Sequence, residues 1–263
     1  MKSNNNSVLA LQHSGGGSSN LIFKSGEPQL KSLWIEIPDY CHLYCDYCYA
    51  STDKKPKHAD HYLSLPDYEK ILKEFASLGG KYVGIPGKGE PFHSKNWELT
   101  HKIINLCADL ELELAIFTTG DAIFFEPHDK IDAVPNKEKM DLIKDKNLII
   151  LIKCNSRIPD IQNKLVNDRH NKYAQLRNRA IDILIDDYHF NDSRKLGIVT
   201  SVLKDNENEI VDLYNWARER NIIFDCDTIL ERGRGKIFTK SGVPPKINLE
   251  AVFKRLKMFN LIS

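Results

Sequence analysis

The chain has 263 residues, an apolar fraction of 41 %, and 37 Lys and Arg against 36 Asp and Glu. Its length and composition predict a globular protein with a sizeable core. A net charge of +1 gives no overall basic field, so nucleic acid is not an expected partner. No apolar run is long enough to cross a bilayer or to form a signal-peptide core, which predicts a cytoplasmic protein without a membrane partner.

Strand patterns and helix patterns alternate along the chain. Residues 1–28 are polar and rich in Ser, Gly and Asn, and they are predicted to form a flexible tail. Beyond them, short apolar segments typical of buried strands are separated by segments with helical spacing. The predicted strands are 33–37, 82–85, 112–118, 148–152, 196–203 and 222–229, and the predicted helices are 65–78, 97–110, 136–146, 173–185 and 207–219.

This alternation predicts the fold class. Strands separated by helices form βαβ units, which build a parallel sheet with right-handed crossovers. Six such units predict an α/β protein with a partial TIM-type (β/α)6 barrel, an open parallel sheet with outer helices. We expect three parts: a polar N-terminal tail over 1–28, the partial barrel over 29–240, and a helical C-terminal tail over 241–263.

The strongest functional signal is a group of cysteines directly after the first predicted strand. Cys41, Cys45 and Cys48 have the spacing Cys-x3-Cys-x2-Cys. In a reducing compartment such residues are thiols or metal ligands. Ordinary electron-transfer 4Fe–4S clusters use four cysteines, so three leave one iron open to another ligand. With an aromatic residue, Tyr47, before the last cysteine, this segment resembles the signature of the radical S-adenosylmethionine (SAM) superfamily.

The resemblance implies a cofactor pair and a reaction. Cys41, Cys45 and Cys48 would hold a 4Fe–4S cluster whose open iron binds SAM. Reductive cleavage of SAM would give a 5′-deoxyadenosyl radical that abstracts hydrogen from a substrate. The expected partners are a peptide or a carbohydrate or other small molecule as substrate, and a reductase, flavodoxin or ferredoxin as electron donor.

Further segments that follow predicted strands are similar to the same superfamily. Residues 86–91 resemble its Gly-Gly-Glu-Pro turn, with Lys88 in place of the first glycine, and residues 118–120 resemble its Thr-Asn-Gly turn. Each of these segments is equally typical of a polar turn that faces water. The SAM contacts that the resemblance implies are Tyr47, Lys88, Gly89, Glu90, Pro91, Thr118, Lys153, Ser156, Thr200 and Arg232.

The other three cysteines do not cluster. Cys107 lies on the apolar side of a predicted helix and is expected in the core. Cys154 and Cys226 lie near the fourth and sixth predicted strands, where a thiol that faces the barrel could donate hydrogen to a substrate radical and a packed thiol would not. Without a second cysteine triad, the chain resembles the SPASM or twitch branch without its C-terminal auxiliary-cluster domain, either as a compact enzyme or as a form that lacks that domain.

Two alternatives to a catalytic cluster stay open. Three cysteines with His42, His58 or His61 form the donor set of a structural zinc site, which would make the chain a binding protein without catalysis. A radical SAM-like fold could also hold the cluster as a non-catalytic partner.

Overall fold

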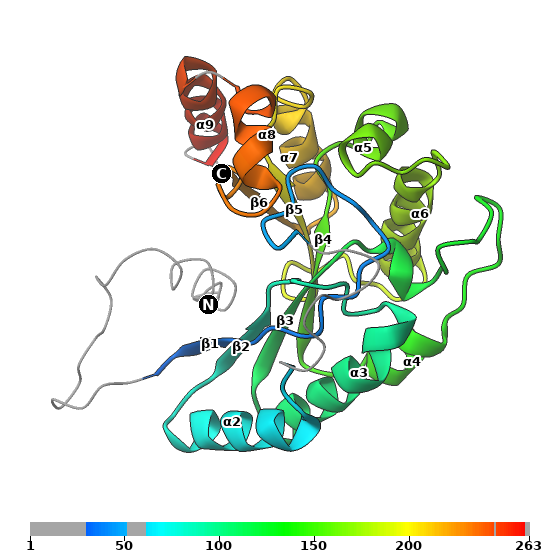
Figure 1. Cartoon of the computed structure of the whole chain (residues 1–263), viewed down its shortest axis with the longest axis vertical. Coiled ribbons are helices and arrows are strands. Elements are labelled where there is room, and N and C mark those ends of the chain that lie inside the picture. Colours follow the sequence, from blue (N-terminus) through cyan, green and yellow to red (C-terminus); the bar gives the residue numbers. More distant parts are fainter. Residues whose placement is uncertain (1–29, 52–61, 245, 261–263) are drawn as a thin grey trace, which may run out of the picture.

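The computed structural model describes residues 30–51, 62–244 and 246–260 (Figure 1). The predicted tail over 1–28 and two of the alternative zinc ligands, His58 and His61, lie outside these residues. Among the described residues, no helix has both the length and the apolar character needed to span a bilayer.

Six parallel strands form the centre of the described structure, and each strand pairs with its neighbour in the sequence. This order confirms the predicted α/β fold with a partial barrel, because the sheet curls without closing (Figure 1). The strands are β1 (Ser32–Trp34), β2 (Tyr82–Ile85), β3 (Glu113–Thr118), β4 (Leu148–Lys153), β5 (Leu196–Ser201) and β6 (Ile223–Asp227).

Helices fill the connections between strands, as parallel pairing requires. Helix α2 follows β1, α3 follows β2, α4 follows β3, the pair α5 and α6 follows β4, α7 follows β5, and α8 and α9 follow β6. Their bounds are α2 (Leu65–Ser77), α3 (Ser94–Asp109), η2 (Asp121–Ile123), α4 (Glu138–Ile143), α5 (Pro159–Leu165), α6 (Tyr173–Asp186), α7 (Ile210–Glu219), α8 (Gly235–Gly242) and α9 (Lys246–Asn260).

Several predicted elements differ from the structure in their bounds. The first strand ends at Trp34 rather than at residue 37, because β2 ends at Ile85 and Pro86 has no N–H to continue the ladder. Helix α5 lies in a segment for which no element was predicted, and it begins at a proline, Pro159, in the first turn. The predicted domain boundary at 240 falls inside α8.

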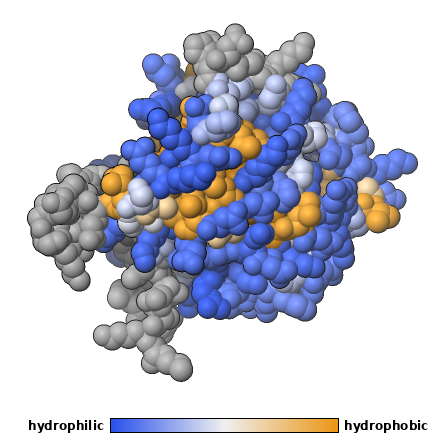
Figure 2. All heavy atoms as spheres, turned by 90° about the horizontal axis from the view of Figure 1, so that it is seen from below, coloured by the Kyte–Doolittle hydropathy of each residue, from blue (hydrophilic) through white to orange (hydrophobic). Residues whose placement is uncertain are grey.

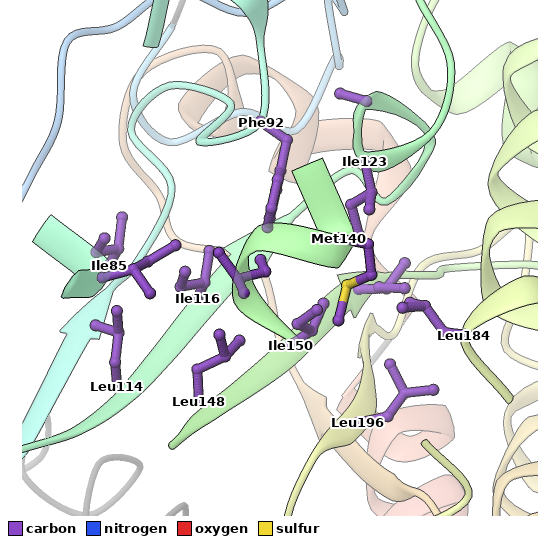
Figure 3. Close-up of a cluster of buried hydrophobic side chains, with 14 of the residues drawn as sticks. Ile85, Phe92, Leu114, Ile116, Ile123, Met140, Leu148, Ile150, Leu184 and Leu196 are labelled. Carbon is purple, nitrogen blue, oxygen red and sulfur yellow. The ribbon is translucent and has the colours of Figure 1, made fainter. Parts of the chain in front are cut away.

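The main core lies between the sheet and its helices. Side chains two residues apart share one face of a strand, so alternate apolar residues of each strand point toward α3, α4 and α6. Figure 3 shows this cluster, in which Met140 of α4 and Leu184 of α6 reach the strand residues. Its labelled members are buried, and they are Ile85, Phe92, Leu114, Ile116, Ile123, Met140, Leu148, Ile150, Leu184 and Leu196.

The other face of the sheet lines the barrel interior and is only partly covered. Ala115, Ile149 and Leu151 of β3 and β4 are buried there, and half-buried apolar residues from β3 and from the other four strands pack beside them. These half-buried residues are Trp34, Tyr82, Phe117, Val199 and Ile223. Hydrophobic side chains also form a band on the molecular face seen in Figure 2, with polar side chains on both sides.

Candidate active site

The cysteine segment crosses the carboxyl end of the sheet and is fixed by the end of α5 (Figure 1). The backbone N–H of Tyr44 donates to the Val166 carbonyl at 3.3 Å, and that of Asp46 donates to the Leu165 carbonyl at 3.2 Å. The Asn167 amide then donates to the Tyr44 carbonyl at 2.9 Å. The loop therefore has a defined path before any ligand binds.

The three thiols of this loop lie close enough to influence one another electrostatically. All three cysteines are half-buried. Burial raises the pKa of Cys41 well above its usual value, and the neighbouring Cys45 and Cys48 raise it further. Burial and Cys48 also raise the pKa of Cys45, to about 12. Each sulfur thus lies close enough to disfavour ionisation of the next, and cationic iron would relieve that repulsion. Three soft thiolate donors fit an iron–sulfur cluster.

The alternative to a cluster at these cysteines is a single metal ion. In the described part of the chain, no three His, Cys, Asp or Glu side chains converge on one ion position. A zinc site would need its sulfur donors about 2.3 Å from one ion. A cluster of four irons spreads its ligands farther apart.

The turn over residues 86–91 packs directly against the start of the cysteine loop. The Glu90 N–H donates to the Tyr40 carbonyl at 2.7 Å. A side chain at Gly89 would place its Cβ only 2.2 Å from the Pro38 carbonyl oxygen, so this position requires glycine. Asn96, which is fully buried, donates to the Pro38, Tyr40 and Glu90 carbonyls at 3.0, 3.2 and 2.9 Å.

The Glu90 carboxylate joins this turn to the end of β3. It accepts hydrogen bonds from the Thr118 hydroxyl at 2.6 Å, the Thr119 N–H at 2.6 Å and the Phe92 N–H at 3.0 Å. Burial raises the pKa of Glu90, and these donors act against that rise. A carboxylate offers about four acceptor positions, so one is left for a further donor.

A buried ion pair, which sequence reasoning missed, connects the cysteine loop to η2. His42 lies 2.9 Å from the Asp121 carboxylate, and the Thr119 hydroxyl donates to the same carboxylate at 2.6 Å. Although burial acts to lower the pKa of His42, the Asp121 charge holds it above its usual value. Apart from the place of His42 inside the cysteine motif, no sequence pattern indicates this pair.

One cation lies on the interior side of the same loop. The Lys153 ammonium group donates to the Ser201 hydroxyl at 2.8 Å and lies 5.5 Å from the centre of the Tyr47 ring. Burial lowers the pKa of Lys153, while the nearby Cys45 and Asp225 act in the opposite direction. The ends of β4 and β5 thus present a positive charge beside the thiols.

Comparisons with known proteins agree with this site. No protein-family model matches the chain. A GTP 3′,8-cyclase of Clostridium perfringens (strain 13 / Type A) is 25 % identical over 233 residues, which is 88 % of this chain and 65 % of the relative. A GTP 3′,8-cyclase of Actinobacillus pleuropneumoniae serotype 5b (strain L20) is 29 % identical over 96 residues, which is 36 % of this chain and 28 % of the relative.

Solved structures with the same fold include two kinds of protein. Streptococcus suis SuiB bound to S-adenosylmethionine aligns with a TM-score of 0.61 and 16 % identity over 88 % of this chain and 48 % of its own. A radical SAM methyltransferase from Sphaerobacter thermophilus aligns with a TM-score of 0.51 and 13 % identity over 84 % of this chain and 63 % of its own. The chain therefore shares its fold with a radical SAM protein, and its cysteine motif resembles that of the superfamily. It spans 28 % of the length of the Actinobacillus relative and 65 % of the Clostridium one.

Several residues singled out from the sequence lie together, and others lie apart. The three cysteines share the loop with Tyr47, and the turn with Gly89, Glu90 and Pro91 abuts that loop. Thr118 binds Glu90, and Lys153 lies over Tyr47. The Lys88 side chain points to Tyr62, with its ammonium group 5.9 Å from the ring centre.

Three predicted SAM contacts have side chains with other partners or positions in this structure. Ser156 is fully buried and its hydroxyl donates to the Glu209 carboxylate at 2.8 Å. Thr200 is fully buried and its hydroxyl donates to the Cys154 carbonyl at 2.7 Å, since strand alternation points the next residue, Ser201, to the interior. Arg232 is exposed on the loop after β6.

The two candidate hydrogen donors, Cys154 and Cys226, lie on the outer face of the sheet. Cys154 belongs to the core between sheet and helices, and Cys226 packs with residues of α7 and α9. Strand alternation explains both positions: Lys153 points inward, so Cys154 points outward, and Cys226 lies on the face opposite Asp225. Neither thiol faces the interior where a substrate radical would form.

Proposed function

We propose that this chain is a radical SAM enzyme, with a 4Fe–4S cluster on Cys41, Cys45 and Cys48 and SAM as cosubstrate. The observation that carries this proposal is the position of three mutually close thiols on one loop over the open interior of a parallel half-barrel. Sites of parallel barrels form at the carboxyl ends of the strands, where this loop lies. A three-cysteine set leaves one iron without a protein ligand.

The chain's own residues would orient SAM. When bound, the reduced cluster supplies the electron that cleaves SAM to a 5′-deoxyadenosyl radical, which takes hydrogen from the substrate. Glu90 keeps one acceptor position for the methionine ammonium group, while Thr118 and the Thr119 N–H hold its carboxylate in place. Lys88, Gly89 and Pro91 supply the backbone of that turn.

Two further contacts belong to this proposal. The Lys153 ammonium group can pair with the methionine carboxylate, and Ser201, which already binds Lys153, replaces Thr200 as the polar side chain on β5. Tyr47 packs beneath the loop beside Cys45 and shields it from water.

For the substrate, we propose a peptide rather than a carbohydrate or other small molecule. SuiB has been solved with its precursor peptide SuiA, and anSMEcpe, which aligns over 77 % of this chain with a TM-score of 0.54 and 15 % identity, has been solved with AdoMet and a peptide. The half-buried apolar residues of the interior face, such as Phe117 and Ile223, offer a surface for side chains of a peptide.

The electron would come from a reductase, flavodoxin or ferredoxin, since the described residues supply one cysteine triad. The cytoplasm stays the predicted compartment, because a reducing environment keeps the six cysteines available as thiols or ligands.

The experiment is an anaerobic SAM-cleavage assay. The reconstituted protein with SAM and dithionite should release 5′-deoxyadenosine, and Cys45→Ala should abolish this release. Cys107→Ala removes a thiol buried in the main core and should retain it. One zinc per chain with no colour would overturn the proposal in favour of a zinc-binding protein. A cluster without any SAM cleavage would overturn it in favour of a non-catalytic partner.

A further inference from the structure

A short segment after β6 binds the backbone of the cysteine loop on the side opposite α5. The backbone N–H groups of Arg234 and Gly235 point to the Cys48 carbonyl, at 3.0 and 3.4 Å. The Arg234 Nε donates to the Cys45 carbonyl at 2.8 Å, and the guanidinium group lies 3.8 Å from the centre of the Tyr44 ring. Carbonyls of two of the three cysteines are therefore held by one segment, residues 233–235.

The backbone of this segment lies in close contact with the backbone of the cysteine loop. Gly233 has a φ of +55°, and a Cβ there would lie 2.3 Å from the Tyr49 carbonyl oxygen and 2.7 Å from that of Cys48. Behind it, Phe238 of α8 packs edge-on against Tyr47 with ring centres 6.2 Å apart. The contact requires glycine at residue 233, and α8 anchors the segment.

The position of Arg234 also has an electrostatic consequence. A guanidinium group stays charged at every accessible pH. Its Nε lies 2.8 Å from the Cys45 carbonyl, which places this charge beside the cysteine loop. A reduced cluster carries one more negative charge than an oxidised one, so a fixed positive charge nearby favours the reduced state.

We propose that Arg234 is a positioning residue of the cluster loop, which fixes the Cys45 and Cys48 carbonyls and makes the cluster easier to reduce. This inference rests on the proposed function, because it assumes that Cys41, Cys45 and Cys48 hold a cluster. It assigns Arg234 a role toward the protein rather than toward SAM or substrate.

The test compares R234Q, R234K and wild type after anaerobic reconstitution, with K236Q as a control that removes an exposed positive charge from the same segment. The readouts are the reduction potential, followed by electron paramagnetic resonance (EPR), and the rate of iron loss to a chelator. R234Q should shift the potential to more negative values and lose iron about tenfold faster, because a charge-assisted hydrogen bond is removed. K236Q should match wild type.

R234K separates charge from geometry. It keeps the charge, so its potential should stay near that of wild type, but it lacks the planar group that stacks on Tyr44, so its iron loss should be faster. If R234Q fails to fold by circular dichroism, R234K decides. Wild-type potential and iron loss in R234Q, or wild-type iron loss in R234K, would overturn the inference. Failure of the proposed function itself would appear earlier, as a wild-type protein that takes up no cluster.

Discussion

Individual buried side chains hold the strand ends in place by binding backbone carbonyl oxygens. Arg177 of α6 is fully buried and donates to the Lys153 carbonyl at 3.1 Å and to the Ser156 carbonyl at 2.7 Å. Asn96 of α3 does the same for three carbonyls around the cysteine loop and the Glu90 turn. Loss of such a donor leaves buried acceptors unpaired, which is costly.

We therefore predict that Arg177→Met destabilises the fold by about 3 kcal/mol, because two charge-assisted hydrogen bonds are lost inside the core. The measurement is urea denaturation followed by circular dichroism. Arg218→Met on the exposed side of α7 is the control and should change stability by less than about 0.5 kcal/mol. Equal stability of the two variants would show that the Arg177 hydrogen bonds contribute nothing to the free energy of unfolding.

Asn96→Asp should destabilise the fold more than the same substitution elsewhere on α3. It replaces the amide donor with carboxylate oxygens that face three carbonyl oxygens, so we expect a loss of about 3 kcal/mol. Denaturation in urea measures it. Asn105→Asp, half-exposed on the same helix, should cost less than about 1 kcal/mol. A similar cost for both substitutions would contradict the bridging role of Asn96.

Contacts between residues close together in the sequence could be predicted, and contacts between distant residues could not. The cysteine triad was predictable because its three members lie within one short loop. Arg234 binds the Cys45 carbonyl across a sequence separation of 189 residues, and Asn96 binds Tyr40 across 56. No local pattern indicates such partners. The faces on which Thr200 and Ser156 lie could not be predicted, because the choice between inner and outer face depends on strand register, which a sequence pattern determines only to within a residue.

At the scale of elements, most strands and helices could be predicted from the period of their hydrophobic residues and from the residue types at helix ends. The strand predicted at 82–85 is β2 to the residue, and α2 begins after Ser64, whose backbone N–H donates to Asp67 at 2.8 Å. Helix α5 was missed because it has only seven residues, too few for a period to show. Helix α8 lies in a segment that resembled a basic loop.

Glycine at the end of α2 gives a prediction at this scale. Gly79 has a φ of +83°, and a Cβ there would meet nothing within 4 Å. Gly79→Ala should therefore cost about 1 kcal/mol from backbone strain alone, and Gly79→Asn should cost less, because Asn tolerates this conformation better. Urea denaturation of the two variants checks the order. Equal or greater stability of Gly79→Ala would show that α2 ends differently.

At the scale of the whole molecule, the sheet brings distant segments to one edge. The cysteine loop follows β1, the Glu90 turn follows β2, Thr118 ends β3, Lys153 ends β4 and Arg234 follows β6. Parallel strands place all their carboxyl ends at the same edge, so the topology alone gathers these groups. The predicted partial barrel was enough to expect this gathering, but not the contacts within it.

Because these segments meet at the site, occupation of the site should stabilise the whole fold. Ligands that bind the folded state alone raise its apparent stability. Anaerobic reconstitution should raise the Tm of the protein, and a chelator should reverse the rise. The triple variant C41A/C45A/C48A should show no such change. A Tm that reconstitution leaves unaltered in the wild type would mean that the loop does not bind the cluster.

The most direct measurement counts iron and sulfide in the anaerobically reconstituted protein and records the EPR spectrum of its reduced form with and without SAM. We expect about four irons and four sulfides per chain, and a spectrum that changes when SAM binds the open iron. A stable cluster whose spectrum is indifferent to SAM, or a protein that retains one zinc and no iron, would contradict the account.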